Sequence, residues 1–252
     1  MDRKPGNPDT LRGKPISYSK QMNASTSALS RILPIARWSV WPADRADEAQ
    51  AAPKLDFVEP MLRRRLSDLA KMSLYVAQDC VRDEPRVRFV YASRHGELHK
   101  TTAMLKDLAQ NEALSPTAFS LSVLNASAGL FSILRKDPSP ATAIAAAEAS
   151  FGFGVLEAIA QFETDRSTPV LYVYADEEAP ALYEVAEPGL FPHAIAMLLS
   201  EDADLHVHLE YDECSEAQTH QQSQSLSFLS CLHEGRSEWR HDGRRWAWQV
   251  AQ

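Results

Sequence analysis

Residues 114–178 read LSPTAFSLSVLNASAGLFSILRKDPSPATAIAAAEASFGFGVLEAIAQFETDRSTPVLYVYADEE, and this stretch decides the fold. Its apolar runs are separated by proline and by charged residues. Residues 141–147 are small and apolar, residues 151–162 have helical length with almost no charge, and residues 169–175 favour a strand. Because charge is nearly absent from these runs, we expect them to lie deep in the core of an α/β fold.

The same alternation of helix and strand continues upstream. A period of two over residues 86–92 predicts a strand, and residues 101–109 predict a helix. From residue 60 onward an apolar stripe at three- and four-residue steps predicts one amphipathic helix. Its members are Leu62, Leu66, Leu69, Met72 and Val76.

The first ordered element is expected at residues 32–41, which are apolar and favour a strand. Residues 1–31 are rich in proline, lysine and small polar side chains and have no stable period, so we expect a disordered tail. Residues 32–252 then form a single domain, with no internal repeat.

Downstream, residues 191–199 suggest a helix, whereas residues 204–211 alternate like a strand. Residues 213–225 are predicted to form a polar loop, followed by a short helix over residues 226–232. In the last segment, Asp242-Gly243 indicates a hairpin turn because both residues tolerate a positive φ.

Composition excludes some classes of function. The chain has 252 residues, 44% of them hydrophobic, which is enough for a sizeable core. Its net charge of -8 argues against general binding of nucleic acid, which needs clustered cations. No apolar run reaches the roughly 18 to 20 residues of a membrane-spanning helix. Three widely spaced cysteines and the absence of a signal-like N-terminus point to a reducing cytoplasm.

Residues 114–178 resemble the central part of condensing enzymes of the β-ketoacyl synthase family. The shared pattern has the form P-x-x-x-x-x-x-V-x-N-x-x-A-G-x-x-[ST]-I, followed by a proline, a small apolar strand, a buried helix and a strand that ends in acidic residues. The matching residues are Pro116, Val123, Asn125, Ala128, Gly129, Ser132, Ile133 and Pro140. The likeness extends over residues 32–211 and implies a thiolase-like layered α/β fold with a mixed sheet, truncated to its N-terminal half.

The resemblance places Glu148 where the family has its nucleophilic cysteine, at the mouth of the buried helix. The family reaction needs a thiolate there, stabilised by the helix dipole, to accept an acyl group. A carboxylate cannot form that thioester. An alternative interpretation of Glu148 is a plain carboxylate at a helix N-terminus.

The histidines of the family's second half are also missing after Tyr211, since His233 is followed by Glu234-Gly235 without the expected Thr. The resemblance therefore implies a non-catalytic chain length factor, as in type II polyketide and aryl polyene systems. Such a subunit pairs with a catalytic β-ketoacyl synthase, needs no cofactor, and works on chains held by an acyl carrier protein that docks mainly on the partner.

The resemblance also implies which residues lie at the interface and the acyl tunnel of the pair. These candidates are Phe119, Leu121, Val123, Leu124, Asn125 and Phe151. Ordinary core packing is the competing explanation for the apolar ones. A bulky side chain in this set is the candidate that limits chain length.

Other groups of polar residues in the sequence give weaker evidence of a functional site. His206, His208 and Glu210 alternate on one strand face, but such triplets are common and we predict no metal site. Ser93, His95 and Glu97 lie too close in sequence for a catalytic relay and indicate a polar loop.

Two further possibilities stay open. Residues 63–65 are three arginines that either face solvent, which we favour, or attract an acidic carrier protein. An independent acyltransferase or hydrolase would need Cys80, Cys214 or Cys231 as its nucleophile.

Overall fold

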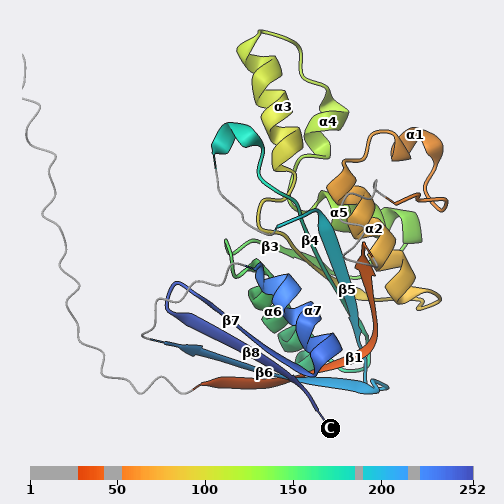
Figure 1. Cartoon of the computed structure of the whole chain (residues 1–252). Helices are drawn as coiled ribbons and strands as arrows, with labels where there is room; N and C mark the ends of the chain where they lie inside the picture. The colour runs from red at the N-terminus through yellow and green to blue at the C-terminus, as the bar shows by residue number, and fades with distance from the viewer. Residues whose placement is uncertain (1–27, 43–52, 185–189, 215–221, 252) are drawn as a thin grey trace, which may run out of the picture.

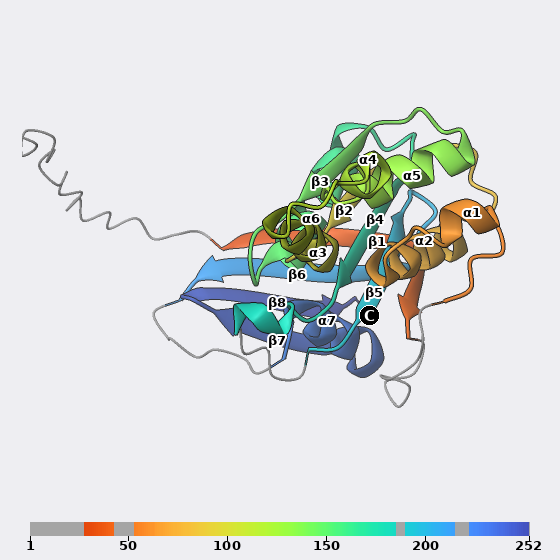
Figure 2. The ribbon, with the colours of Figure 1, turned by 90° about the horizontal axis from the view of Figure 1, so that it is seen from above.

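The computed structural model describes residues 28–42, 53–184, 190–214 and 222–251. Its centre is one mixed sheet of eight strands in the order β3-β2-β4-β5-β1-β6-β8-β7. The strands are β1 (Leu29–Trp41), β2 (Arg88–Ala92), β3 (Ala141–Ile144), β4 (Val170–Asp176), β5 (His193–Leu199), β6 (Leu205–Glu213), β7 (Arg236–His241) and β8 (Arg244–Val250). β2 pairs in parallel with β3 and β4, and the other neighbours are antiparallel. In Figure 2, β3 and β7 lie at opposite ends of the sheet.

Helices cover the sheet unevenly. They are α1 (Pro60–Arg63), α2 (Asp68–Val81), α3 (Leu98–Ala109), α4 (Pro116–Ser120), α5 (Ala126–Arg135), α6 (Ser150–Thr164) and α7 (Gln224–Glu234), with a 3-10 turn, η3, at Ala181–Tyr183. α6 and α7 pack into one core, and α2 and α5 into the other. Figure 1 shows α3 and α4 standing away from the sheet at one end.

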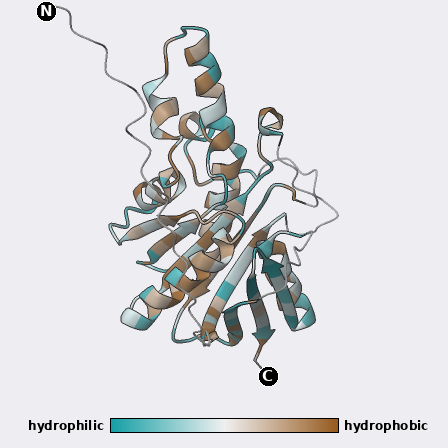
Figure 3. Cartoon of the chain, turned by 90° about the vertical axis from the view of Figure 1, so that its left-hand side faces the viewer, coloured by the Kyte–Doolittle hydropathy of each residue, from teal (hydrophilic) through white to brown (hydrophobic). Residues whose placement is uncertain are grey.

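The two cores lie on opposite faces of the central strands. On β4, Tyr172 and Tyr174 face the core that contains α6, whereas Leu171 and Val173 face the core that contains α2. Every residue of β4 and β5 is buried. Figure 3 shows hydrophobic residues concentrated in the centre of the molecule.

Most elements predicted from the sequence are confirmed, including the strands at residues 86–92, 169–175 and 204–211 and the helices at residues 101–109, 151–162 and 226–232. The strand expected at residues 141–147 is confirmed only as far as Ile144, because residues 145–147 belong to a turn. The hairpin turn is also confirmed, since Asp242 and Gly243 have φ of 48° and 70°. The apolar segment 119–134 contains parts of two helices, α4 and α5. Most of the predicted polar loop, residues 215–221, lies outside the described residues.

The helix predicted at residues 191–199 is wrong, because His193–Leu199 forms strand β5. A strand that is buried on both faces has no alternation, so its apolar run looks the same as a segment of buried helix. The single helix predicted from residue 60 is also wrong. It divides into α1 and α2 because the Ser67 side chain accepts a hydrogen bond from Ala70 N–H and caps a new helix.

The N-terminal boundary also differs from the expectation. β1 begins at Leu29 and pairs there with Tyr211, so residues 29–31, which were assigned to the disordered tail, belong to the sheet. Residues 1–27 lie outside the described part. At the other end, the chain after Tyr211 adds α7, β7 and β8 to the same domain.

Asp137 connects the starts of the two parallel strands β2 and β3. Its carboxylate accepts hydrogen bonds from Val87 N–H at 2.9 Å and from Ser139 N–H at 3.0 Å. Burial of Asp137 disfavours its charged form, but these bonds and a contact with the Ser139 hydroxyl outweigh burial, so the pKa of Asp137 lies below its ordinary value. The charged form therefore stabilises the fold.

We predict that Asp137→Asn lowers the free energy of unfolding at pH 7 by about 1 to 3 kcal/mol. The neutral amide has only one oxygen, so it cannot replace the carboxylate as acceptor for both Val87 N–H and Ser139 N–H. Since the folded pKa is lowered, the contribution is complete above about pH 4 and is lost as the pH falls through the folded pKa. Urea unfolding at pH 7 and pH 3 checks this, with the exposed Asp83→Asn as the control. An equal acid sensitivity in wild type and Asp137→Asn would contradict it.

Candidate functional site

The candidate site lies where the carboxyl ends of β2 and β4 meet the turn between β3 and α6. Ligands of α/β sheets bind at such carboxyl ends. Residues 93–97 follow β2, Asp176 ends β4, and Glu148 lies in the turn two residues before α6 begins. Residues that are distant in the sequence therefore meet at one edge of the domain.

Glu148 is held by two basic side chains. Its Oε1 accepts a hydrogen bond from Arg94 Nη2 at 2.9 Å, and its Oε2 lies 3.7 Å from His241 Nε2. Arg94 follows β2, whereas His241 comes from the end of β7 and stacks on Trp239 with an interplanar angle of 18°. The Glu148 side chain is 36% exposed. The carboxylate is thus engaged on both oxygens, and it lacks the sulfur that a thioester requires.

A buried polar chain lies between the sheet and α7. Tyr174 donates its hydroxyl to Asp176 Oδ2 at 2.9 Å. His193 bonds the Phe191 carbonyl through Nδ1 and the Ser225 hydroxyl through Nε2, at 2.8 and 2.7 Å. The carbonyl can only accept, so Nδ1–H donates to it, and the Ser225 hydroxyl is the partner of Nε2. His193 and Ser225 are fully buried, and their bonds join β5 to the start of α7.

On the other side of the site, the buried carboxyl group of Glu97 joins the start of α3 to the start of α2. Glu97 accepts a hydrogen bond from the Ser67 hydroxyl at 2.7 Å, and burial raises the pKa of Glu97 above its ordinary value. Burial is also the largest cause that raises the pKa of Glu177 to about 7, and the charges of Glu97, Asp68 and Asp176 add to it. Among the described residues, no group of three His, Cys, Asp or Glu side chains has the geometry of a metal site.

The predicted interface residues do not share one environment. Phe119 is 61% and Val123 is 43% exposed, and Asn125 is also exposed. Leu121 is buried, whereas Leu124 is half-buried beside the core that contains α2. Phe119 lies on α4, which stands away from the sheet (Figure 1), whereas Val123 and Asn125 lie between α4 and α5.

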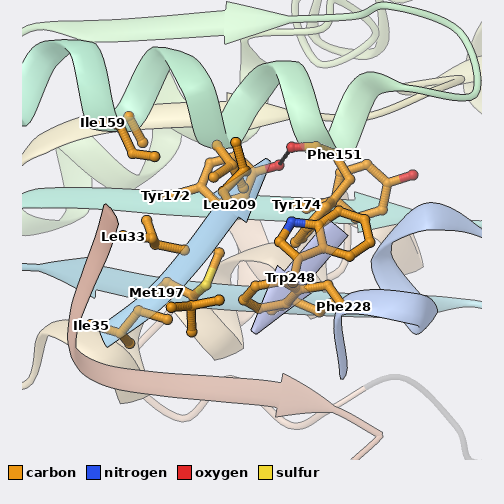
Figure 4. Packing of buried hydrophobic residues seen from close by; sticks show 14 of the residues in the cluster. Leu33, Ile35, Phe151, Ile159, Tyr172, Tyr174, Met197, Leu209, Phe228 and Trp248 are labelled. Atoms are coloured by element: carbon orange, nitrogen blue, oxygen red, sulfur yellow. Dashed lines mark hydrogen bonds between the residues drawn. The ribbon is translucent and has the colours of Figure 1, made fainter. Parts of the chain in front are cut away.

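Phe151 lies apart from that group, in the core between α6 and the sheet. It is fully buried, and its ring contacts those of Tyr172, Tyr174, Phe228 and Trp248. Its carbonyl accepts a hydrogen bond from the Tyr172 hydroxyl at 2.7 Å, as Figure 4 shows. In this structure Phe151 packs the core, which is the alternative that the sequence left open.

The other candidate motifs have structural roles. Ser93 Oγ accepts a hydrogen bond from Gly96 N–H, and Glu97 bonds Ser67, so Ser93, His95 and Glu97 form a polar turn and not a relay. His206 and His208 lie on an exposed face of β6. Arg63 bonds the Leu55 carbonyl, while Arg64 and Arg65 are exposed.

Arg94 and His241 were missed by the sequence reasoning. The only available signal for Arg94 was its place directly after a buried strand. Nothing in the sequence indicated that the turn of the C-terminal hairpin returns to the end of β3.

Two of the three cysteines, Cys80 and Cys231, are poor nucleophiles. Burial raises the pKa of Cys80 to about 12 and that of Cys231 to about 11, and both side chains are buried. Because the thiolate is the reactive form, these thiols are unreactive near neutral pH. Cys214 is half-buried.

Comparison with known proteins gives one family. A model described as the N-terminal domain of β-ketoacyl synthases matches residues 38–249. No curated protein matches the chain. Among the described residues, no helix has both the length and the apolar character needed to cross a bilayer.

Three solved structures are similar. One is the ketosynthase ApeO in complex with its chain length factor ApeC from Xenorhabdus doucetiae, with 29% identity, a TM-score of 0.71, and coverage of 87% of this chain and 99% of that chain. The ishigamide ketosynthase/chain length factor has 16% identity and a TM-score of 0.59, over 81% and 72% of the two chains. A β-ketoacyl synthase from Burkholderia phymatum has 13% identity and a TM-score of 0.56, over 81% and 69%.

We predict that a thiol reagent such as iodoacetamide at pH 8 leaves Cys80 and Cys231 unmodified in the folded protein. Both thiols stay protonated and covered there. In urea all three cysteines should react. Peptide mass spectrometry after alkylation measures the modified positions, and rapid modification of Cys80 or Cys231 in the folded protein would restore the case for a cysteine nucleophile.

Proposed function

The chain belongs to the β-ketoacyl synthase family, through the N-terminal domain, and from this premise we propose that it is a non-catalytic chain length factor. In this proposal it pairs with a catalytic β-ketoacyl synthase and shapes the acyl tunnel of the pair in aryl polyene, fatty acid or polyketide synthesis. The observation that carries the proposal is Glu148, which occupies the position proposed for the nucleophile and is tied to Arg94 and His241.

Similar proteins support a partner. The ketosynthase ApeO is solved in complex with its chain length factor, and the ishigamide protein is described as a ketosynthase/chain length factor. The alternative function, an independent acyltransferase or hydrolase with a cysteine nucleophile, has less support because Cys80 and Cys231 are buried thiols with raised pKa values.

The edge strand β3 is the proposed contact with the partner. Its residues are small or apolar and uncharged, and no other strand of the described chain pairs with its outer edge. The opposite edge strand, β7, is charged, and Ser227 of α7 donates a hydrogen bond to the Glu238 carbonyl. Charged edges resist pairing, whereas an uncharged open edge invites another strand.

The backbone register shows which β3 groups are open. The Pro140 carbonyl accepts from Phe89 N–H at 3.0 Å, and the Ile144 carbonyl accepts from Ser93 N–H at 3.3 Å. Because successive residues of a parallel ladder alternate in direction, Ala141 and Ala143 point their N–H and C=O groups toward the open edge.

We predict that Ala143→Pro lowers affinity for the partner synthase at least tenfold while the domain stays folded, since it removes an outward N–H that β2 does not use. Ala143→Val keeps that N–H and is the matched control. Coexpression with a candidate catalytic synthase, followed by size-exclusion chromatography and calorimetry, measures the effect. A wild-type chain that stays monomeric and binds no such synthase would refute the proposed pairing.

Phe119 and Val123 are the candidate tunnel residues, because the family resemblance puts their segment beside the acyl tunnel and their side chains are exposed in the single chain. We predict that Phe119→Ala lengthens the product of the reconstituted pair and that Val123→Trp shortens it. Each added methylene gains about 0.8 kcal/mol when buried, which is enough to shift a product distribution. Mass spectrometry of the products measures their chain lengths. Unchanged chain lengths in an intact complex would exclude both residues from the tunnel.

A further inference from the structure

We propose that Glu148 is a positioning residue that holds β3 in the geometry required for docking the partner, an inference that rests on the proposed function. Glu148 is then more than a substitute for a missing nucleophile. Its carboxylate joins three parts of the chain, the loop after β2, the turn after β3 and the C-terminal hairpin, through Arg94 and His241.

The edge strand needs such support because it is short. β3 has four residues and is paired on one side only, with β2. On one face of β3, Gln161 of α6 donates a hydrogen bond to the Thr142 hydroxyl at 3.1 Å. Ala143 and Ile144 are only partly buried where they pack against the two cores, so the turn of residues 145–149 adds support at the C-terminal end of the strand.

That turn is strained next to Glu148. Ala147 has a φ of 49°, a left-handed conformation that a side chain with a Cβ disfavours. Strained backbone persists only where surrounding contacts fix it. One such contact lies within the turn, where the Ser150 hydroxyl accepts from Ala146 N–H at 2.8 Å and donates to the Ala147 carbonyl. Two further contacts join the turn to the rest of the molecule: Ala149 packs into the core that contains α6, and the Glu148 carboxylate bonds Arg94 and lies 3.7 Å from His241.

Charge and position suit this role. Arg94 is 20% and Glu148 is 36% exposed, so their ion pair is only partly screened by water. Arg94 extends from the end of β2, the strand that pairs with β3, so its bond to Glu148 supports the β2–β3 register beyond the last ladder pair, Ala92 with Ile144. Loss of the carboxylate charge should loosen this end while both cores stay packed.

The test is partner binding by Glu148→Gln, which keeps the shape of the side chain and removes its charge. We expect three- to tenfold weaker binding of the synthase by calorimetry, with an unchanged thermal midpoint and an unchanged product distribution in the saturated complex. Glu163→Gln is the matched control. Glu163 pairs with Arg31 at the far end of α6, so its neutralisation removes an Arg–Glu pair that is remote from β3.

A double-mutant cycle with Arg94→Gln separates positioning from general destabilisation. If Arg94 acts through Glu148, adding Arg94→Gln to Glu148→Gln weakens binding less than Arg94→Gln does in the wild-type background. Equal binding by wild type and Glu148→Gln would overturn the inference alone. A changed chain length with unchanged affinity would also overturn it, since Glu148 would then be a pocket residue. A wild-type chain that binds no synthase would remove the proposed function and the inference with it.

Discussion

The close approach of α6 to the sheet is the constraint on which the rest of the structure depends. A Cβ at Gly154 would lie 2.6 Å from the Tyr172 ring, and one at Gly152 would lie 2.7 Å from Trp246, so only glycine allows this packing. The Tyr172 hydroxyl then donates a hydrogen bond to the Phe151 carbonyl, which fixes the distance between α6 and the sheet. Since the turn that contains Glu148 leads directly into α6, this packing also sets where the candidate site lies.

The same packing explains how the C-terminal segment completes the domain. Trp246 and Trp248 of β8 are fully buried against α6 and α7, so the hairpin is bound into the core that contains Phe151. The turn of the hairpin therefore lies beside the turn that follows β3, where His241 approaches Glu148. The region after Tyr211 extends the sheet on one side and completes the candidate site at the same time.

The two edge strands of the sheet differ in charge and in how they are covered. This difference suits a protein that pairs with a partner through one edge only. β7 is covered by α7 and carries charged side chains, which oppose further pairing. β3 presents small uncharged residues, and the side chains of Phe119 on α4 and Val123 after it are exposed. Apolar side chains exposed on a projecting segment are typical of surfaces that another chain covers.

The sequence by itself determined the alternation of helices and strands, the hairpin at Asp242-Gly243 and the family, because these depend on local periodicity, turn chemistry and motif order. It did not distinguish β5 from a helix, since a strand covered on both faces has no alternation and its burial is decided by the packing of α2, α6 and α7. It pointed to Glu148 but not to Arg94 or His241. It also grouped Phe151 with residues 119–125, whereas Phe151 lies in the core between α6 and the sheet. These points were settled by tertiary packing, because each depends on contacts between separate segments of the chain, and local sequence does not encode which segments meet.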